Sequence, residues 1–175
     1  MSGLDFDIED VYLPGEESDS VPVFDTCDEI RRKINVHLRK HGVTQAKLCR
    51  DICSQYHSAH KPANIQAVQL TRFRSAKGPT AGTKSIIFYG AYVLFEKIRV
   101  KQGKHKSKHR MEMEALWPSG IGMTRDSRTT LALPHKHIKR CTDHNTSRRY
   151  WASSSAQIHQ DKYGRVQISV NRQTS

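Results

Sequence analysis

The sequence predicts an all-α fold: a small bundle of four or five helices with a helix-turn-helix-like unit, between a disordered acidic N-terminal arm and a mostly disordered basic C-terminal tail. Three observations predict it. Apolar residues recur at helical spacing between residues 26 and 117, helix-capping side chains stand at the starts of those segments, and the flanking segments lack such a period. A chain of 175 residues has room for one such domain, which we place at 25–118.

Residues 1–24 form the predicted acidic arm. The first 25 residues contain eight Asp and Glu and no Lys or Arg, whereas the whole chain has a formal net charge of +12. Acids mixed with Ser, Gly and Pro are typical of a disordered segment. The apolar residues among these acids leave two roles open: the arm folds onto a partner, or it lies over the protein's own basic face as a competitor for polyanions.

The first two helices are predicted from their caps. Thr26 and Glu29 form a capping box at the start of a helix over about 26–41, whose apolar residues repeat every three or four positions. Thr44 caps a short second helix that ends near residue 55.

Three further helices complete the predicted bundle. Asn64 caps a third helix that runs to about residue 75. The segment 85–100 is apolar around most of its circumference, as is typical of a buried helix, so we expect it at the centre of the core. Its β-branched and aromatic residues would also suit a strand, but its length of 16 residues favours a helix. A last helix over 107–117 stops at Pro118.

Residues 119–175 form the low-complexity basic tail. We predict disorder over 118–148, where no usable period occurs. A short hairpin is predicted at 156–170, because two strand-like segments flank the turn sequence Asp161 to Gly164.

Composition argues against several classes of protein. No apolar run reaches the roughly 18 residues of a membrane span, and the N-terminus is acidic where a secretory signal is basic and then apolar. We therefore expect no membrane association and an intracellular protein whose four cysteines are reduced. No carboxylate pair, and no Ser or Cys with a His and an acid, has the spacing of a catalytic site, so we expect neither an enzyme nor a cofactor.

Cys49, Cys53, His57 and His60 are four zinc-ligand types within twelve residues. Structural zinc sites usually draw two ligand pairs from separated elements, whereas these residues crowd one predicted helix and its exit. We therefore interpret the two cysteines as core residues and predict no metal site.

The segment 78–85, G-P-T-A-G-T-K-S, is similar to a phosphate-binding loop. Its glycines are separated by three residues rather than four, and Thr83 stands between Gly82 and Lys84, so the spacing does not fit a nucleoside triphosphatase. The start of the following helix can still contact one phosphate of a nucleic acid backbone.

The strongly basic charge favours a polyanionic partner, and the second and third helices suit a helix-turn-helix unit. In such a unit the second helix enters the major groove, where Gln and Arg contact base edges while Lys and Arg hold phosphates. The link over 55–63 is longer than the usual three or four residues, so an ordinary helical domain with a basic face stays the alternative. The predicted base contacts are Gln66, Gln69, Arg72 and Arg74, and the predicted phosphate contacts are Lys84, Lys97, Arg99, Lys101, Lys104, Lys106, Lys108 and Arg110.

Two resemblances accompany these patterns. The stretches G-V-T-Q-A-K-L-C-R-D-I (42–52) and I-Q-A-V-Q-L-T-R-F (65–73) resemble the paired helices of phage-repressor-like helix-turn-helix domains. Over about 25–118, D-T-C-D-E-I-R-R-K-I, K-G-P-x-A-G, F-Y-x-A-Y-V-x-F-E-K-I-R and G-K-x-K-S-K-H-R-x-E-M-E resemble an uncharacterised helical domain of fungal proteins. This second resemblance implies a nuclear or regulatory role and assigns no catalytic or binding residues.

The sequence thus predicts a DNA-binding module in the nucleus, with a role in transcription regulation or chromatin. RNA is the alternative nucleic acid. The alternative of another class is a protein-interaction module that docks acidic protein partners and binds no nucleic acid.

Overall fold

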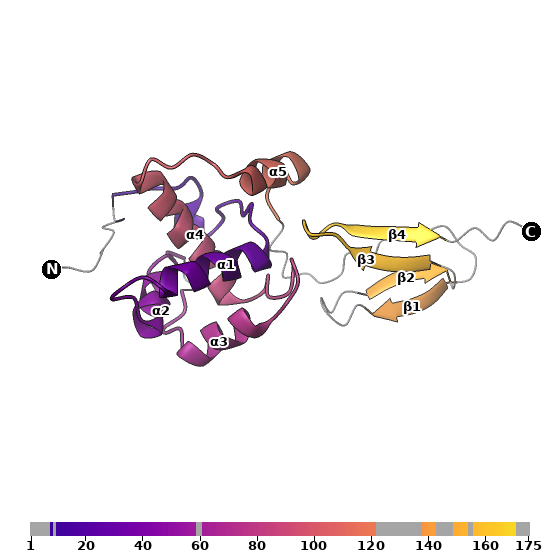
Figure 1. Cartoon of the computed structure of the whole chain (residues 1–175), viewed down its shortest axis with the longest axis horizontal. Coiled ribbons are helices and arrows are strands. Elements are labelled where there is room, and N and C mark those ends of the chain that lie inside the picture. The colour runs from indigo at the N-terminus through magenta and orange to yellow at the C-terminus, as the bar shows by residue number, and fades with distance from the viewer. Residues whose placement is uncertain are drawn as a thin grey trace, which may run out of the picture.

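The computed structural model describes residues 8, 10–58, 61–121, 138–142, 149–153 and 156–170. Within residues 8–121 the regular structure is helical, which confirms the predicted all-α bundle (Figure 1). A 3-10 helix, η1 (Glu16–Ser18), precedes five α-helices: α1 (Cys27–Leu38), α2 (Gln45–Cys53), α3 (Ala67–Ser75), α4 (Ile86–Lys101) and α5 (Lys108–Leu116).

Side-chain hydroxyls fix the starts of four of these helices. Thr26 accepts a hydrogen bond from the third amide of α1, and Thr44 does the same for α2. Ser85 caps α4, and Ser107 caps α5. Each hydroxyl satisfies an amide that has no partner inside its helix, so the capping residues place these starts correctly from sequence.

Helix α3 begins later than predicted. Its N-cap is Gln66 rather than Asn64, and the Gln69 side chain accepts a hydrogen bond from the Gln66 amide at 2.9 Å. The link from α2 therefore spans 54–66 and is longer than the predicted one. Ile65, which is buried, anchors the end of this link in the core.

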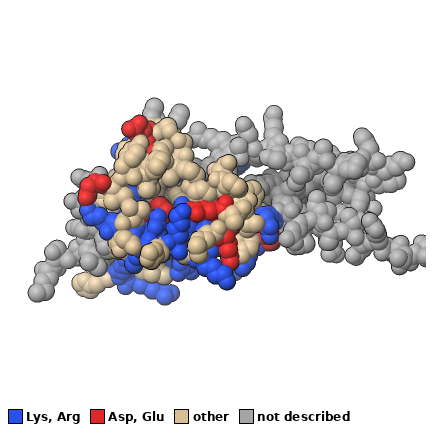
Figure 2. All heavy atoms as spheres, turned by 90° about the horizontal axis from the view of Figure 1, so that it is seen from above, with Lys and Arg blue, Asp and Glu red and all other residues tan. Residues whose placement is uncertain are grey.

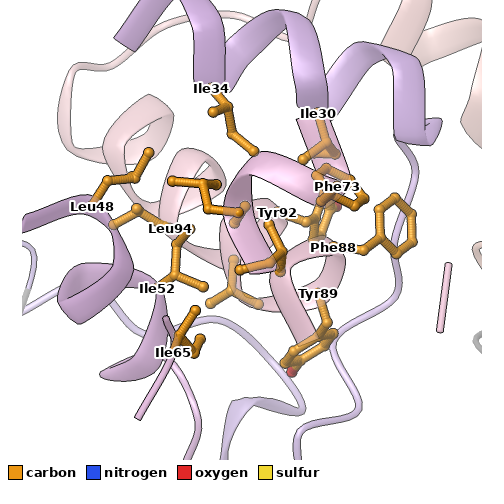
Figure 3. Close-up of a cluster of buried hydrophobic side chains, with 14 of the residues drawn as sticks. Ile30, Ile34, Leu48, Ile52, Ile65, Phe73, Phe88, Tyr89, Tyr92 and Leu94 are labelled. Carbon is orange, nitrogen blue, oxygen red and sulfur yellow. The ribbon is translucent and has the colours of Figure 1, made fainter. Parts of the chain in front are cut away.

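The hydrophobic core surrounds α4, as predicted from its apolar circumference. Helices α1, α2 and α3 all pack against α4. Figure 3 shows Ile30, Ile52 and Phe73 from those three helices around Phe88 and Tyr92 of α4. Burial on this scale is the main stabilising contribution to a domain of this size.

Residues 10–24 correct the prediction of a disordered arm over 1–24. Leu13, Val21 and Val23 are buried, and the amide of Ile121 donates to the carbonyl of Val23 at 2.7 Å. The apolar residues scattered among the acids pack on the helices, so the segment has the buried surface that disordered segments lack. Residues 1–7 and 9 lie outside the described residues.

Two antiparallel hairpins follow the helical domain. The strands β3 (Ala156–Gln160) and β4 (Val166–Val170) form the hairpin that the sequence predicts. The strands β1 (Ile138–Thr142) and β2 (Arg149–Ser153) form a second hairpin, and β1 lies inside the segment that we expected to be disordered. Residues 118–121 of that segment are described as well, whereas 122–137 and 143–148 lie outside the described residues.

The turn between β3 and β4 contacts α5. The hydroxyl of Tyr163 donates to Glu112 at 2.7 Å, and the indole nitrogen of Trp117 donates to the Tyr163 carbonyl at 3.3 Å. In the described part of the chain, no helix combines the length and the apolar character of a membrane span.

Candidate nucleic-acid interface

The outer side of α3 is open to solvent. Leu70 and Phe73 are buried and attach the helix to the core. This arrangement leaves Val68, Thr71 and Arg72 exposed, and Val68 is 67% exposed. Arg72 forms no ion pair with any residue that the structure describes, so its guanidinium is available to a ligand.

The other three predicted base contacts have structural roles. Arg74 is half-buried and donates from Nε to Asn35 Oδ1 at 2.8 Å, which links α3 to α1. Gln66 and Gln69 are exposed but form the reciprocal cap at the start of α3. These three side chains have local partners that compete with base edges, and the sequence gives no warning of the Asn35 contact.

Arg31 organises the turn segment 76–85 that follows α3. This buried side chain donates from Nε to the Phe73 carbonyl at 2.8 Å, from Nη1 to the Gly78 carbonyl at 3.0 Å, and from Nη2 to the Ala81 carbonyl. Its guanidinium carbon also lies 4.9 Å from the centre of the Phe73 ring. A rigid planar guanidinium can satisfy several acceptors at once, so Arg31 holds the turn beside α3.

Arg31 was not among the residues predicted to have a role, although the sequence contains a signal for it. Arg31 lies four residues after Cys27 and three before Ile34, and both of these are fully buried residues of the α1 stripe. Positions at those spacings share a helix face, which places Arg31 beside the core and Arg32 away from it.

The glycines of the phosphate-loop-like segment allow a tight turn that packs closely against α3. Gly78 and Gly82 have φ values of 112° and 111°, which favour glycine. A Cβ on Gly82 would lie 2.8 Å from the Phe73 ring. Lys84 is exposed at the end of this segment, and Lys77 is exposed at its start.

Three predicted phosphate contacts pair with carboxylates of the domain itself, and two of them are buried, which corrects their assignment. Lys97 is 6% exposed and forms an ion pair with Glu16. Arg99 donates to Glu96 at 2.9 Å and to the carbonyl of Lys104 at 2.7 Å. The sequence shows these cations as one basic run but does not show that buried carboxylates face them.

Arg110 is the third of these cations. It is buried between Glu96 and Glu114, at 3.3 and 2.7 Å, and its guanidinium lies 4.4 Å from the centre of the Phe24 ring. The carboxyl of Glu96 pairs with both Arg99 and Arg110. Burial would raise its pKa, but the hydrogen bond from Arg99 and the charges of the two arginines hold that pKa below its ordinary value. Arg110 therefore attaches α5 to α4.

The other cations of the basic run lie nearer the surface. Lys101 pairs with Asp10 at 2.5 Å, and Lys106 pairs with Glu114 at 2.9 Å. Lys104 and Lys108 are exposed. In Figure 1 α5 and the link between α4 and α5 run on the opposite side of α1 from α3, so the segments that contain these lysines are separated from the helix that contains Arg72.

Further cations lie where α1 meets α2. Burial, and then the charges of Lys40 and Lys47, lower the pKa of His37 at the end of α1. Arg39 and Arg50 are exposed in the same two segments. Figure 2 shows Lys and Arg gathered along one side of the helical domain, with Asp and Glu among them.

The predicted zinc-ligand types do not gather. Cys49 is buried, which raises the pKa of its thiol, and the thiol of Cys53 donates to the Pro62 carbonyl at 3.1 Å. Among the described residues, no three His, Cys, Asp or Glu side chains are placed to hold a metal ion. His60 lies outside that part of the chain.

Part of the helical domain matches a known family model. Residues 21–105 match the model of a family described as "Domain of unknown function (DUF7726)". The match runs from just before α1 to just after α4, and it supports the resemblance to an uncharacterised helical domain. Neither a fungal origin nor a similarity to helix-turn-helix proteins follows from it. A search of curated proteins gives no match, and a search of solved structures gives none either.

Proposed function

We propose that the helical domain binds duplex DNA as a regulatory module, with the outer face of α3 in the major groove. The observation that carries this proposal is the exposed side of α3, where Arg72 projects without an ion pair to any described residue. Arginine is the commonest side chain to contact guanine in the major groove, where its guanidinium bonds two acceptors at once.

The size and chemistry of α3 suit this role. Nine residues give a helix of about 14 Å, comparable with the width of the major groove. Thr71 offers a hydroxyl and a methyl group, and the apolar Val68 suits the methyl group of thymine. These contacts would add sequence preference to the affinity that charge supplies.

Phosphate contacts in this proposal come from the turn after α3. Lys77 and Lys84 are exposed there, in the segment that Arg31 positions. Lys104 and Lys108 belong to the α4–α5 link and to α5, which run on the other side of α1 from α3, so they would reach phosphates only of DNA that bends around the domain. A nuclear location and a role in transcription or chromatin are parts of the same proposal.

The test is a fluorescence-anisotropy titration of the full chain with a panel of duplexes, at about 50 and 200 mM salt. We expect Arg72→Ala to reduce the discrimination between preferred and other duplexes by about 1–3 kcal/mol. We expect Lys77→Ala to weaken binding to every duplex alike and to reduce the salt slope by about 1. Equal effects of the two variants on all duplexes would contradict the proposed roles.

A protein-interaction module is the second candidate. One observation favours it: the helical domain holds an acidic segment of its own chain, residues 13–19, through a buried ion pair to Glu16 and further hydrogen bonds to Glu16 and Asp19. No binding to duplex DNA, single-stranded RNA or heparin, together with binding of an acidic peptide, would favour this candidate.

A further inference from the structure

The acidic segment contacts the helical domain through one face. Leu13, Glu16 and Asp19 are spaced by three residues, and all three side chains face the helical domain: Leu13 packs in the core, Glu16 pairs with Lys97, and Asp19 accepts the His57 amide. Leu13 and Glu16 are buried, and Asp19 is half-buried. Glu17 lies between them in sequence but is exposed.

Glu16 enters a polar site lined by α4 and the link after α2. Its side chain is 4% exposed, and its carboxylate forms an ion pair with Lys97. The same oxygen lies 2.8 Å from Nε2 of His57, and the other oxygen accepts the Leu13 amide at 3.1 Å. Both oxygens therefore have partners, as a carboxylate at this depth requires.

Asp19 binds two successive amides of the same link. Its oxygens accept the N–H groups of His57 and Ser58 at 3.0 and 3.2 Å, and the Ser58 hydroxyl donates to it as well. These contacts resemble the way a helical N-terminus or a turn captures a carboxylate. The amides would select an acidic group whichever chain supplied it.

Both carboxyls are held in the charged form. Burial would raise the pKa of Glu16, but hydrogen bonds from Lys97 and the Leu13 amide hold it below its ordinary value. Burial likewise would raise the pKa of Asp19, and hydrogen bonds from Ser58 and the two amides lower it. The site therefore favours carboxylates over neutral groups.

Only one side of this contact lies within the range that matches the family model. Lys97, His57 and Ser58 lie inside the matched range 21–105, whereas residues 13–19 lie outside it. We infer that the surface formed by Lys97, His57 and Ser58 is a docking site for acidic peptides of the form L-x-x-E-x-x-D, filled in the free protein by residues 13–19. A partner with such a segment competes with the chain's own one. This inference is independent of DNA binding.

The test supplies the segment from outside. In the full chain, the double variant Glu16→Gln with Asp19→Asn removes both charged contacts of the internal segment, and a fluorescent peptide of residues 10–20 is then titrated by anisotropy. We expect the peptide to bind this variant at least tenfold more tightly than the wild type, because in the wild type the internal segment occupies the site at a high effective concentration.

A matched pair of peptides identifies the contact. The peptide with Glu16→Gln and the peptide with Glu17→Gln lose the same charge, but only Glu16 faces the site. We expect the first to lose at least tenfold in affinity and the second to keep it within about twofold, since one paired carboxylate contributes 1.4 kcal/mol or more. Equal losses, or equal binding to variant and wild type, would overturn the inference.

Circular dichroism checks that the double variant keeps its helices. Should it unfold, amide hydrogen exchange of the wild type decides the question. A docked segment opens locally, so the amides of residues 13 and 15–19 and those of His57 and Ser58 are expected to exchange together and faster than the Leu94 amide in the core. Exchange at the rate of Leu94 would make the segment an inseparable part of the core and overturn the inference.

Discussion

At the level of single residues, Arg31 is a buried cation that joins α1 to the segment after α3. Its guanidinium donates to three backbone carbonyls and also pairs with Asp28 at 2.7 Å. Those carbonyls lose their donors when the guanidinium is removed, and a buried acceptor without a partner is costly. Arg31 is therefore expected to matter more for stability than its exposed neighbour.

Replacing Arg31 with Met is expected to lower the free energy of unfolding by about 2–4 kcal/mol. Urea unfolding followed by circular dichroism measures it. The control is Arg32→Met, whose side chain is 63% exposed and pairs only with Glu29 among the described residues, so its expected cost is about 0–1 kcal/mol. Similar losses in the two variants would contradict the role of Arg31.

Gly90 allows α2 to approach α4. A Cβ at Gly90 would lie 2.7 Å from the Ile52 methyl carbon and 2.8 Å from its carbonyl oxygen. Alanine is the better helix former by about 1 kcal/mol, yet overpacking costs about 1–3 kcal/mol, so we expect Gly90→Ala to lower the melting temperature. Thermal unfolding tests this against Gly103→Asn, where φ is +60° and no atom lies within 4 Å of an added Cβ. An unchanged or higher melting temperature for Gly90→Ala would show that the helices separate at no cost.

At the level of elements, α5 lies beyond the matched range 21–105 and is attached by few residues. Arg110 bonds to Tyr92 and Glu96 of α4, and Met113 is fully buried beneath the helix. We expect α5 to open more readily than the helices that surround α4, because local stability follows buried apolar contact.

Met113→Ala is expected to cost about 2–5 kcal/mol in the stability of α5. The measurement is amide hydrogen exchange, in which the amides of α5 lose protection while those of α2 keep it. Met111→Ala is the control, because Met111 is 54% exposed on the same helix and its truncation removes little packing. Loss of protection throughout the domain would mean that α5 and the core unfold as one unit.

The elements also show which sequence signals were reliable. Thr26, Thr44 and Ser107 placed helix starts correctly, because a cap acts within one turn of its own helix. The start of α3 was wrong by a few residues, since Gln66 is an unusual N-cap and the buried Ile65 fixes where the link ends. The β1–β2 hairpin was missed because the sequence between its strands, residues 143–148, contains no two-residue turn signal such as Asn-Gly.

At the level of the whole molecule, ionisable groups on several elements favour stability near neutral pH. Three carboxyls, those of Glu16, Glu29 and Glu96, have a pKa below their ordinary value of 4.5. They stabilise the fold above pH 4.5, and this stability is lost as the pH falls through the folded-state pKa. Burial raises the pKa of Tyr89 to about 12 from 10.0, so this group stabilises the fold below pH 10 and the stability is lost as the pH rises towards 12.

We therefore expect the urea midpoint to be highest between about pH 5 and 9 and to fall on both sides. Glu16→Gln should flatten the acid side, because the variant has no charge to lose there, whereas Glu17→Gln should leave the profile unchanged. A profile of Glu16→Gln that is parallel to the wild-type profile would show that Glu16 carries no part of the acid dependence.

The sequence alone determined the helical class, most helix starts and the central position of α4. Each of these follows from information within a few turns: capping residues act on adjacent amides, and the apolar circumference of 85–100 requires burial whatever surrounds it. The exposed side of α3 also followed, because Leu70 and Phe73 define its inner face.

The tertiary structure alone decided which charged groups are available to a partner. Lys97, Arg99 and Arg110 belong to one basic run in the sequence, yet carboxylates from η1, α4 and α5 pair with them. The sequence shows that a residue is charged but not whether its side chain is buried or paired. That depends on partners that can be distant in the chain, as Glu16 is from Lys97, 81 residues away. The acidic segment and its docking surface likewise exist only once distant parts of the chain meet.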